Sequence, residues 1–271
     1  MAQMLVEDGV TVVACTPHIL PGLYHNNGPQ ILQAVQQLQQ HLDTQGIPLQ
    51  LTTGADVHMV PDFVNGLRSG HLLSIANSRY VLVEPPHHVP PLRLDEFFFQ
   101  LSVAGYVPVL THPERLRWIK SHYSTIQGLA RAGTWMQVTS GSLLGRFGKT
   151  AQYWAERMLD EGLVHILATD AHDTQRRPPN LRLGHEIAAR RLGETEADHL
   201  VVTRPLGIVN NQEPSSLPMP TSAMTSSSGV THAQSEGRST DADSGDSPVG
   251  VPLHARDSRG GMAERLRRFF K

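Results

Sequence analysis

The chain has one cysteine, no excess of positive charge and no long apolar run, and each shortage excludes a class of protein. Among its 271 residues the lone Cys15 cannot form an internal disulfide, which fits a reducing compartment. A formal net charge of −2 provides no basic face of the size that nucleic acids require. No apolar run approaches the roughly 18 residues that span a bilayer, and no signal sequence follows Met1. We therefore expect a cytoplasmic protein that binds no nucleic acid.

Residues 1–210 alternate between short apolar runs and helix-like stretches. The runs cover residues 10–15, 49–53, 80–83, 107–110, 135–138 and 164–168. The spacing of apolar residues predicts helices over residues 29–43, 94–104, 123–132, 149–161 and 181–192. Nearly continuous apolar strands are typical of parallel sheets that are covered on both faces. The pattern therefore predicts an α/β fold, with a barrel and a doubly wound sheet as the alternatives.

The composition changes after residue 210. Residues 211–261 are rich in Ser, Thr, Pro, Gly, Ala and Asp, without apolar periodicity, which predicts a disordered linker. Residues 262–271 form a short basic amphipathic tail. One interpretation of this tail is a docking motif for an acidic partner or a membrane surface. The other interpretation is a solvated, fraying end.

Five of the six apolar runs lead into side chains that bind metal ions, whereas the sixth leads into the small polar residues 139–142. The candidate ligands are His18, Asp56, Glu84, His112, Asp170 and His172. The carboxyl ends of parallel barrel strands meet at one rim, so we expect these side chains to form a cluster there. Carboxylates and imidazoles suit Mn²⁺ and Mg²⁺. Each residue alone is compatible with an ordinary polar loop, but the set predicts a metal-dependent hydrolase.

Two arginines follow these strand ends, and a cysteine nucleophile is disfavoured. Arg115 comes shortly after His112, and Arg177 shortly after His172, where the planar guanidinium fork suits a phosphate oxyanion. Either arginine could equally be a solvated surface residue. Cys15 has no arginine shortly after it, so we interpret it as a small hydrophobe that ends a buried strand. Residues 141–150 lack the spacing of a Walker phosphate loop.

Taken together, these motifs resemble the bacterial capsular-polysaccharide protein tyrosine phosphatases of the CpsB/CapC type. That family is a branch of the PHP (polymerase and histidinol phosphatase) superfamily. The resemblance covers about residues 1–210. It rests on Thr16-Pro17-His18, Gly54-Ala55-Asp56, the run 78–84 that ends in Glu84, Thr111-His112-Pro113-Glu114-Arg115, the run 141–148, and Thr169-Asp170-Ala171-His172 through Arg177-Pro178-Pro179.

The resemblance implies a distorted (β/α)7 barrel with two or three Mn²⁺ ions, and Mg²⁺, Fe or Zn²⁺ also fit the ligand types. In this scheme His18, His172 and Asp170 hold one metal ion, Glu84 and His112 hold a second, and Asp56 bridges. Arg115 and Arg177 bind the phosphate, and a metal-bound hydroxide attacks it. The implied substrate is a tyrosine-phosphorylated protein, namely a kinase that controls polysaccharide assembly.

Two features depart from the family pattern. The family opens with a strand that carries His-x-His, with an aspartate a few residues later, whereas this chain opens with residues that look like the following helix. Asp56 also stands where the family has a longer glutamate. We therefore expect weaker metal binding and an unpaired barrel edge, from either a late start of the reading frame or a degenerate protein. The alternatives are a phosphoesterase for a small phosphate such as histidinol phosphate, and a non-catalytic remnant that binds phosphoproteins.

Overall fold

The computed structural model describes residues 1–223, in which every paired strand of the two sheets is parallel. The strands are β1 (Val12–Cys15), β2 (His18–Ile19), β3 (Gln50–Thr53), β4 (Asp56–His58), β5 (Tyr80–Glu84), β6 (Val107–Thr111), β7 (Trp135–Thr139) and β8 (Ile166–Ala168). One sheet has the order β1-β3, and the other has the order β2-β4-β5-β6-β7-β8. The α/β class with parallel strands is confirmed.

The two sheets share one register where they meet. Val12 pairs with Gln50 in the first sheet, and His18 pairs with Asp56 in the second, so the offset of 38 positions is the same in both (50 − 12 and 56 − 18). The backbone NH of Asp56 also donates to the carbonyl of Pro17 at 3.2 Å. Pro17 cannot donate to a ladder, so β1 and β2 act as one strand with a break.

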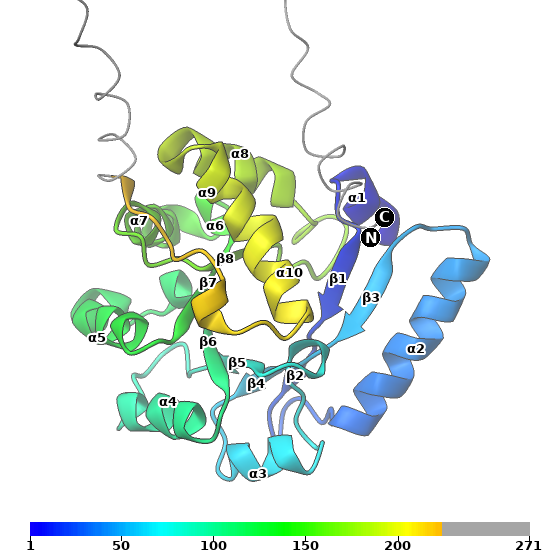
Figure 1. Ribbon diagram of the computed structural model, residues 1–271, viewed down its shortest axis with the longest axis horizontal. Helices are drawn as coiled ribbons and strands as arrows, with labels where there is room; N and C mark the ends of the chain where they lie inside the picture. Colours follow the sequence, from blue (N-terminus) through cyan, green and yellow to red (C-terminus); the bar gives the residue numbers. More distant parts are fainter. Residues whose placement is uncertain (224–271) are drawn as a thin grey trace, which may run out of the picture.

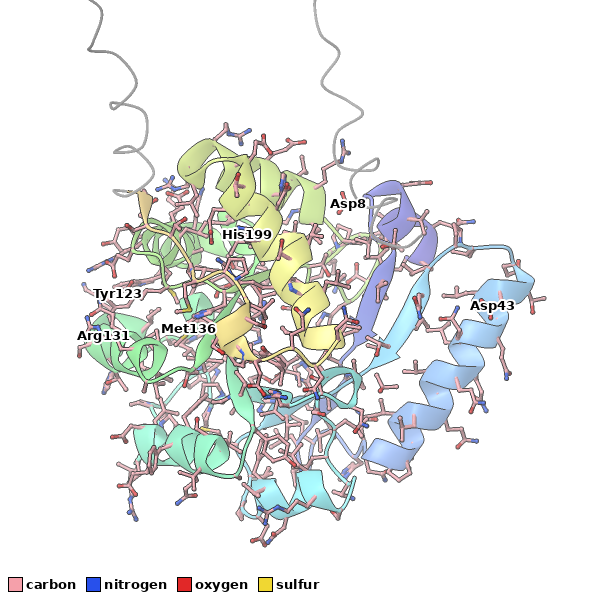
Figure 2. All side chains as sticks on the ribbon, viewed as in Figure 1. Asp8, Asp43, Tyr123, Arg131, Met136 and His199 are labelled. Carbon is pink, nitrogen blue, oxygen red and sulfur yellow. The ribbon has the colours of Figure 1, made fainter. Side chains whose placement is uncertain are left out.

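Helices surround these strands (Figure 1). The α-helices are α1 (Ala2–Glu7), α2 (Gly28–Thr44), α3 (Phe63–Arg68), α4 (Leu94–Val103), α5 (Ile119–Arg131), α6 (Ser140–Leu143), α7 (Gly148–Asp160), α8 (Leu181–Leu192), α9 (Glu194–Asp198) and α10 (Arg204–Val209). The short turns are η1 (Ile75–Asn77), η2 (Pro113–Arg115), the π-helical η3 (His199–Thr203) and η4 (Pro214–Ser216). Asp43 on α2 and Arg131 on α5 are exposed, whereas Met136 on β7 is fully buried (Figure 2).

Both faces of the larger sheet are buried, which explains its continuous apolar strands. On one face Val81, Leu110 and Met136 belong to the main core beneath the helices. The alternate residues, such as Tyr80 and Trp135, belong to a second core that includes Ile208 of α10 and Leu217. Successive residues of a strand point to opposite faces, so each face needs its own cover. The second face also carries the polar side chains at the strand ends.

All six predicted strands are present, and the five predicted helices match α2, α4, α5, α7 and α8 within a few residues. The structure adds β2, β4 and the helices after residue 193. Residues 211–223, which the sequence assigned to the linker, pack against the domain. Here Tyr80 donates to the carbonyl of Gln212 at 2.9 Å, and Leu217 is buried. The remainder of the linker and the basic tail lie outside the described residues.

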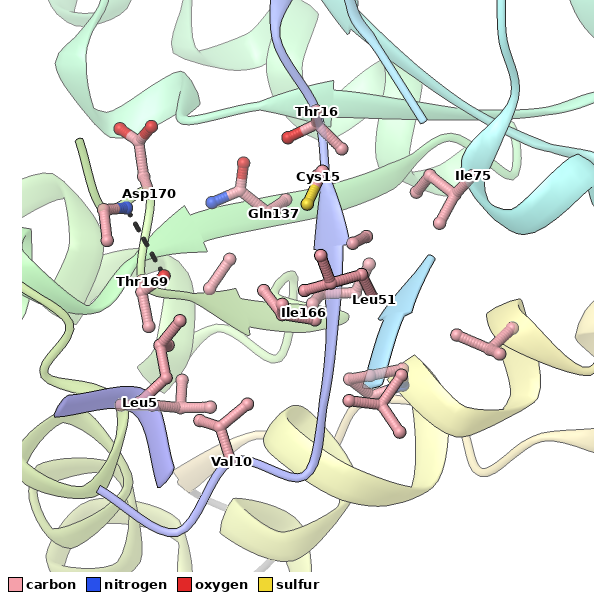
Figure 3. A pocket seen from close by; sticks show the side chains of 18 of the residues that line it. Leu5, Val10, Cys15, Thr16, Leu51, Ile75, Gln137, Ile166, Thr169 and Asp170 are labelled. Atoms are coloured by element: carbon pink, nitrogen blue, oxygen red, sulfur yellow. Dashed lines mark hydrogen bonds between the residues drawn. The ribbon is translucent and has the colours of Figure 1, made fainter. Parts of the chain in front are cut away.

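A cavity of about 720 Å³ lies between β1 and β8 (Figure 3). Leu5, Val10, Leu51 and Ile166 are among its apolar lining residues, and Asp170 lies at one end of it. Within residues 1–223, β1 pairs only with β3 and β8 pairs only with β7. The cavity therefore separates two strand edges that have no partner on this side. No helix in the described part of the chain is long and apolar enough to cross a membrane.

Candidate metal centre

The strand register brings four polar side chains together at the carboxyl end of the sheet. His18 on β2 pairs with Asp56 on β4, and His58 on β4 pairs with Glu84 on β5. Asp56 and His58 are two residues apart, so their side chains lie on the same face of the strand. His112 follows directly after β6, next along the sheet. The predicted clustering of His18, Asp56, Glu84 and His112 is what the structure shows.

Each oxygen of the Glu84 carboxylate faces two imidazoles. Oε2 lies 3.0 Å from His18 Nδ1 and 2.7 Å from His58 Nε2. Oε1 lies 2.9 Å from His87 Nε2 and 3.5 Å from His112 Nε2. Burial acts to raise the pKa of Glu84, but the imidazoles of His18, His58 and His87 outweigh it and hold the pKa well below its ordinary value. Glu84 is therefore an anion at neutral pH.

Asp56 lies between the two groups of imidazoles. Its Oδ2 atom is 3.7 Å from His18 Nδ1 and 3.9 Å from His112 Nε2. Burial, followed by the charge of Glu84, raises the pKa of Asp56 to about 8. Burial also holds the pKa of His112 well below its ordinary value. A cation bound among these side chains would offset the cost of burial and stabilise the ionised form of Asp56.

Two of the candidate ligands have left-handed backbone conformations. His112 has φ +34°, and Asp170 has φ +49°. Residues other than glycine rarely adopt this region, and such strained residues concentrate at functional sites. In both cases the residue follows the end of a strand, β6 or β8, where the backbone turns away from the sheet. The strain therefore places two polar side chains at the same rim.

The predicted phosphate ligands Arg115 and Arg177 both contact Asp170. Arg115 Nη1 donates to Asp170 Oδ2 at 2.6 Å, and Arg177 Nη2 donates to the same oxygen. Arg177 Nη2 also donates to the Asp170 backbone carbonyl at 3.1 Å. The Phe147 ring lies against both guanidinium groups, with centroid distances of 4.3 Å to Arg115 Cζ and 5.6 Å to Arg177 Cζ. The two arginines thus form a preassembled anion site that Asp170 occupies.

His172 and Asp170 lie at the margin of the cluster. His172 Nδ1 is 3.6 Å from Asp170 Oδ1, and its side chain is 41% exposed. Its ring centroid is 6.2 Å from that of His18. The structure therefore places these two residues beside the site, but it brings neither within ion-pair distance of Glu84 or Asp56. Their role as metal ligands stays a prediction.

The residues present fit a divalent cation. Five buried atoms of this cluster have no hydrogen-bond partner, namely His18 Nδ1, Asp56 Oδ1, His58 Nε2, Glu84 Oε2 and His112 Nδ1. Several of these atoms lie 2.7–3.0 Å apart without being aligned to share a hydrogen. Adjacent ligands of a six-coordinate cation at about 2.1 Å are also roughly 3 Å apart. Within residues 1–223, every ion pair of Asp56 and Glu84 is to a histidine, with no arginine or lysine to neutralise them.

The sequence interpretation missed two histidines of this cluster. His58 could have been found, because it follows Asp56 by two positions and therefore shares its face of the strand. His87 lies in the loop after β5, and only the folded structure brings it to Glu84. Cys15 ends β1 as predicted, but β1 is only partly buried and not the buried strand that the sequence suggested. Burial raises the pKa of the Cys15 thiol, which disfavours the thiolate that a nucleophile needs.

Comparison with known proteins shows the family to which the chain belongs. The CpsB/CapC family, described as capsular polysaccharide synthesis, matches residues 1–210. The chain belongs to the CpsB/CapC family. It is 34% identical over 177 residues to the tyrosine-protein phosphatase YwqE of Bacillus subtilis (strain 168), which covers 65% of this chain and 70% of that protein. It is 30% identical over 172 residues to the putative tyrosine-protein phosphatase CapC of Staphylococcus aureus, covering 64% and 68% respectively.

Solved structures show the same CpsB/CapC fold. The crystal structures of YwqE from Bacillus subtilis and CpsB from Streptococcus pneumoniae, described as unique metal-dependent tyrosine phosphatases, include a chain that matches with a TM-score of 0.73. The match has 29% sequence identity and covers 82% of this chain and 90% of that chain. The family that the sequence motifs predicted is confirmed.

Proposed function

We propose that this chain is a metal-dependent protein tyrosine phosphatase that acts in capsular or exopolysaccharide synthesis. The observation that carries the proposal is the buried cluster around Glu84, where two carboxylates lie among imidazoles at the carboxyl ends of parallel strands. This chemistry agrees with the relatives that are named metal-dependent tyrosine phosphatases. The substrate is a tyrosine-phosphorylated protein, and a kinase of polysaccharide assembly is the partner we propose.

The mechanism assigns separate tasks to the two groups of residues. His18, Asp56, Glu84 and His112 would hold the cations, which we propose are Mn²⁺. Bound divalent cations generate a nucleophile from water at neutral pH and polarise phosphoryl oxygens. The low pKa of Glu84 keeps its carboxylate available, and the low pKa of His112 keeps its imidazole neutral, as ligands require.

Arg115 and Arg177 would bind the phosphate oxygens of the substrate. Both guanidinium groups converge on one carboxylate oxygen of Asp170, so the pair is positioned for an oxyanion. Planar forks suit phosphate as well as carboxylate. A phosphate dianion carries more charge than the Asp170 carboxylate and would compete with it for these donors. Asp170 and His172, which lie next to each other, would be further ligands for the cations once phosphate binds the arginines.

We also propose that the two sheets form a distorted barrel with a slot between β1 and β8. The shared register of β1-β3 and β2-β4 supports one continuous strand order from β1 to β8. The 720 Å³ cavity between the two unpaired edges would give room for the strand with His-x-His that the resemblance implies. Filling this slot with a His-x-His strand should tighten Mn²⁺ binding and raise the unfolding temperature. Unchanged affinity and unfolding temperature would contradict the slot.

A substrate panel tests the proposed activity. At saturating Mn²⁺, the chain should hydrolyse phosphotyrosine peptides in preference to phosphoserine peptides and histidinol phosphate. His112→Ala should abolish that turnover, because it removes a buried side chain of the cluster. Faster hydrolysis of histidinol phosphate would point to a small-molecule phosphoesterase instead. Binding of a phosphotyrosine peptide without turnover at any Mn²⁺ concentration would indicate a non-catalytic binding protein.

A further inference from the structure

We propose that His58 and His87 are metal ligands, and that this chain holds a dinuclear centre in which Glu84 and Asp56 bridge two divalent cations. The inference rests on the proposed function, and it assigns the ligands of that same site. One cation would be held by His18 and His58, and the other by His87 and His112. Neither His58 nor His87 was in the set of ligands predicted from the sequence.

The two oxygens of the Glu84 carboxylate each face a different pair of imidazoles. The nitrogens of His18 and His58 are within 3.0 Å of Oε2. The nitrogens of His87 and His112 are within 3.5 Å of Oε1. A carboxylate that binds one cation through each oxygen is a bridging ligand. The geometry thus provides two sets of ligand atoms that meet at one residue.

Asp56 lies between these two sets of ligand atoms. Asp56 Oδ2 is 3.7 Å from His18 Nδ1, in the first set, and 3.9 Å from His112 Nε2, in the second. Its other oxygen, Oδ1, is buried without a hydrogen-bond partner. Asp56 is therefore placed to contact both cations. Each cation would then have two imidazoles and two carboxylates.

The fold holds both His58 and His87 in place. His58 ends β4 in register with Glu84, so the sheet fixes its position. The loop that carries His87 is fixed by two hydrogen bonds, from Trp118 Nε1 to the Pro86 carbonyl at 2.9 Å and from the Arg117 NH to the His87 carbonyl at 3.0 Å. The His87 ring centroid lies 5.1 Å from that of His112. Neither imidazole is a freely rotating surface group.

The buried carboxyl groups of the cluster have no arginine or lysine among their described ion-pair partners. The charge of the Asp170 carboxylate is already balanced by Arg115 and Arg177. Asp56 and Glu84 are 7% and 4% exposed. Buried carboxylates are costly unless charges of opposite sign are close. Two divalent cations would supply that charge where the described ion pairs offer only histidines.

Metal binding tests the inference without relying on turnover. The full chain is freed of metal with a chelator and titrated with MnCl₂ by calorimetry, and the bound metal is measured after desalting. We expect two equivalents in the unaltered chain. His58→Ala and His87→Ala should each weaken one site by about tenfold or more, since loss of even an outer-shell partner costs 10- to 100-fold. His71→Ala and His88→Ala are matched controls, because both side chains are exposed and outside the cluster.

The outcomes separate this inference from the proposed function. One equivalent in the unaltered chain, or unchanged affinity in both His58→Ala and His87→Ala, would overturn the dinuclear centre even if phosphotyrosine is hydrolysed. Two equivalents that depend on His58 and His87 would support it even if no phosphotyrosine is hydrolysed. Titration with Co²⁺ adds a second readout, because loss of an imidazole ligand should change the visible absorption spectrum. Thermal unfolding of the metal-free variants identifies any that fail to fold.

Discussion

Replacing Phe147 should weaken phosphate binding, although its side chain carries no polar group. The ring lies 4.3 Å from Arg115 Cζ and 5.6 Å from Arg177 Cζ, so it supports both guanidinium groups opposite Asp170. The lack of a side chain at Gly141 makes room for it, because a Cβ there would lie 3.0 Å from the Phe147 ring. Phe147→Leu keeps the apolar bulk but removes the aromatic face.

The size of the effect follows from the burial of the two arginines. Cation–π contacts contribute about 0.5–1 kcal/mol at exposed sites and about 2 kcal/mol when desolvated. The side chains of Arg115 and Arg177 are 17% and 28% exposed. We therefore expect Phe147→Leu to cost about 1–2 kcal/mol of transition-state stabilisation, or roughly 5- to 30-fold in kcat/KM. The assay is steady-state hydrolysis of a phosphotyrosine peptide at saturating Mn²⁺.

Two further variants decide whether the aromatic face is responsible. Phe147→Trp should retain most of the activity, because indole is the strongest aromatic partner for a cation. Tyr153→Leu, an exposed aromatic on the following helix α7, should have no effect on kcat/KM. An unchanged kcat/KM in Phe147→Leu, or an equal loss in the Leu and Trp variants, would show that the aromatic face of Phe147 does not support the two arginines. Mn²⁺ affinity should be the same in all three variants.

Three predictions concern stability. Glu114→Ala should lower the free energy of unfolding by about 2–4 kcal/mol in urea, because it leaves the buried Ser142 hydroxyl and a backbone NH without an acceptor; a change under about 0.5 kcal/mol would contradict this. Arg204→Met should lower the free energy of unfolding by about 3–5 kcal/mol, because it leaves Glu196 buried and unpaired. A variant more stable than the unaltered chain would contradict this prediction. Burial and then Arg204 lower the pKa of His165 from 6.5 to about 3, so only the unfolded state binds its proton between these values. Its contribution to stability should rise with pH across that window, by up to about 1.4 kcal/mol per unit, and a slope unchanged in His165→Asn would count against it.

The strands β5, β6 and β7 were predictable because each is a short apolar run whose two faces are both largely buried. Tyr80 and Val81, for example, are adjacent in β5 and belong to the two different cores. The strand β4 was not predictable in this way, since Asp56-Val57-His58 contains one apolar residue and is defined by its pairing with β2 and β5. The helices after residue 193 were missed as well, although Leu200 and Ile208 are buried.

The site was partly predictable for the same physical reason. Side chains that directly follow parallel strands meet at one rim, so His18, Asp56, Glu84 and His112 could be grouped from the sequence alone. The contact of Asp170 with Arg115 joins residues 55 positions apart and depends on the packing of the loops. No local pattern indicates that the arginines hold this carboxylate.

The most direct test of the central claim is metal removal and restoration in one preparation. Hydrolysis of a phosphotyrosine peptide is measured after chelation, after dialysis, and again after Mn²⁺ is added back. We predict no turnover in the metal-free protein, recovery on addition of Mn²⁺, and no recovery in His112→Ala. Turnover that persists after chelation and in His112→Ala would show that the cluster around Glu84 does not carry the reaction.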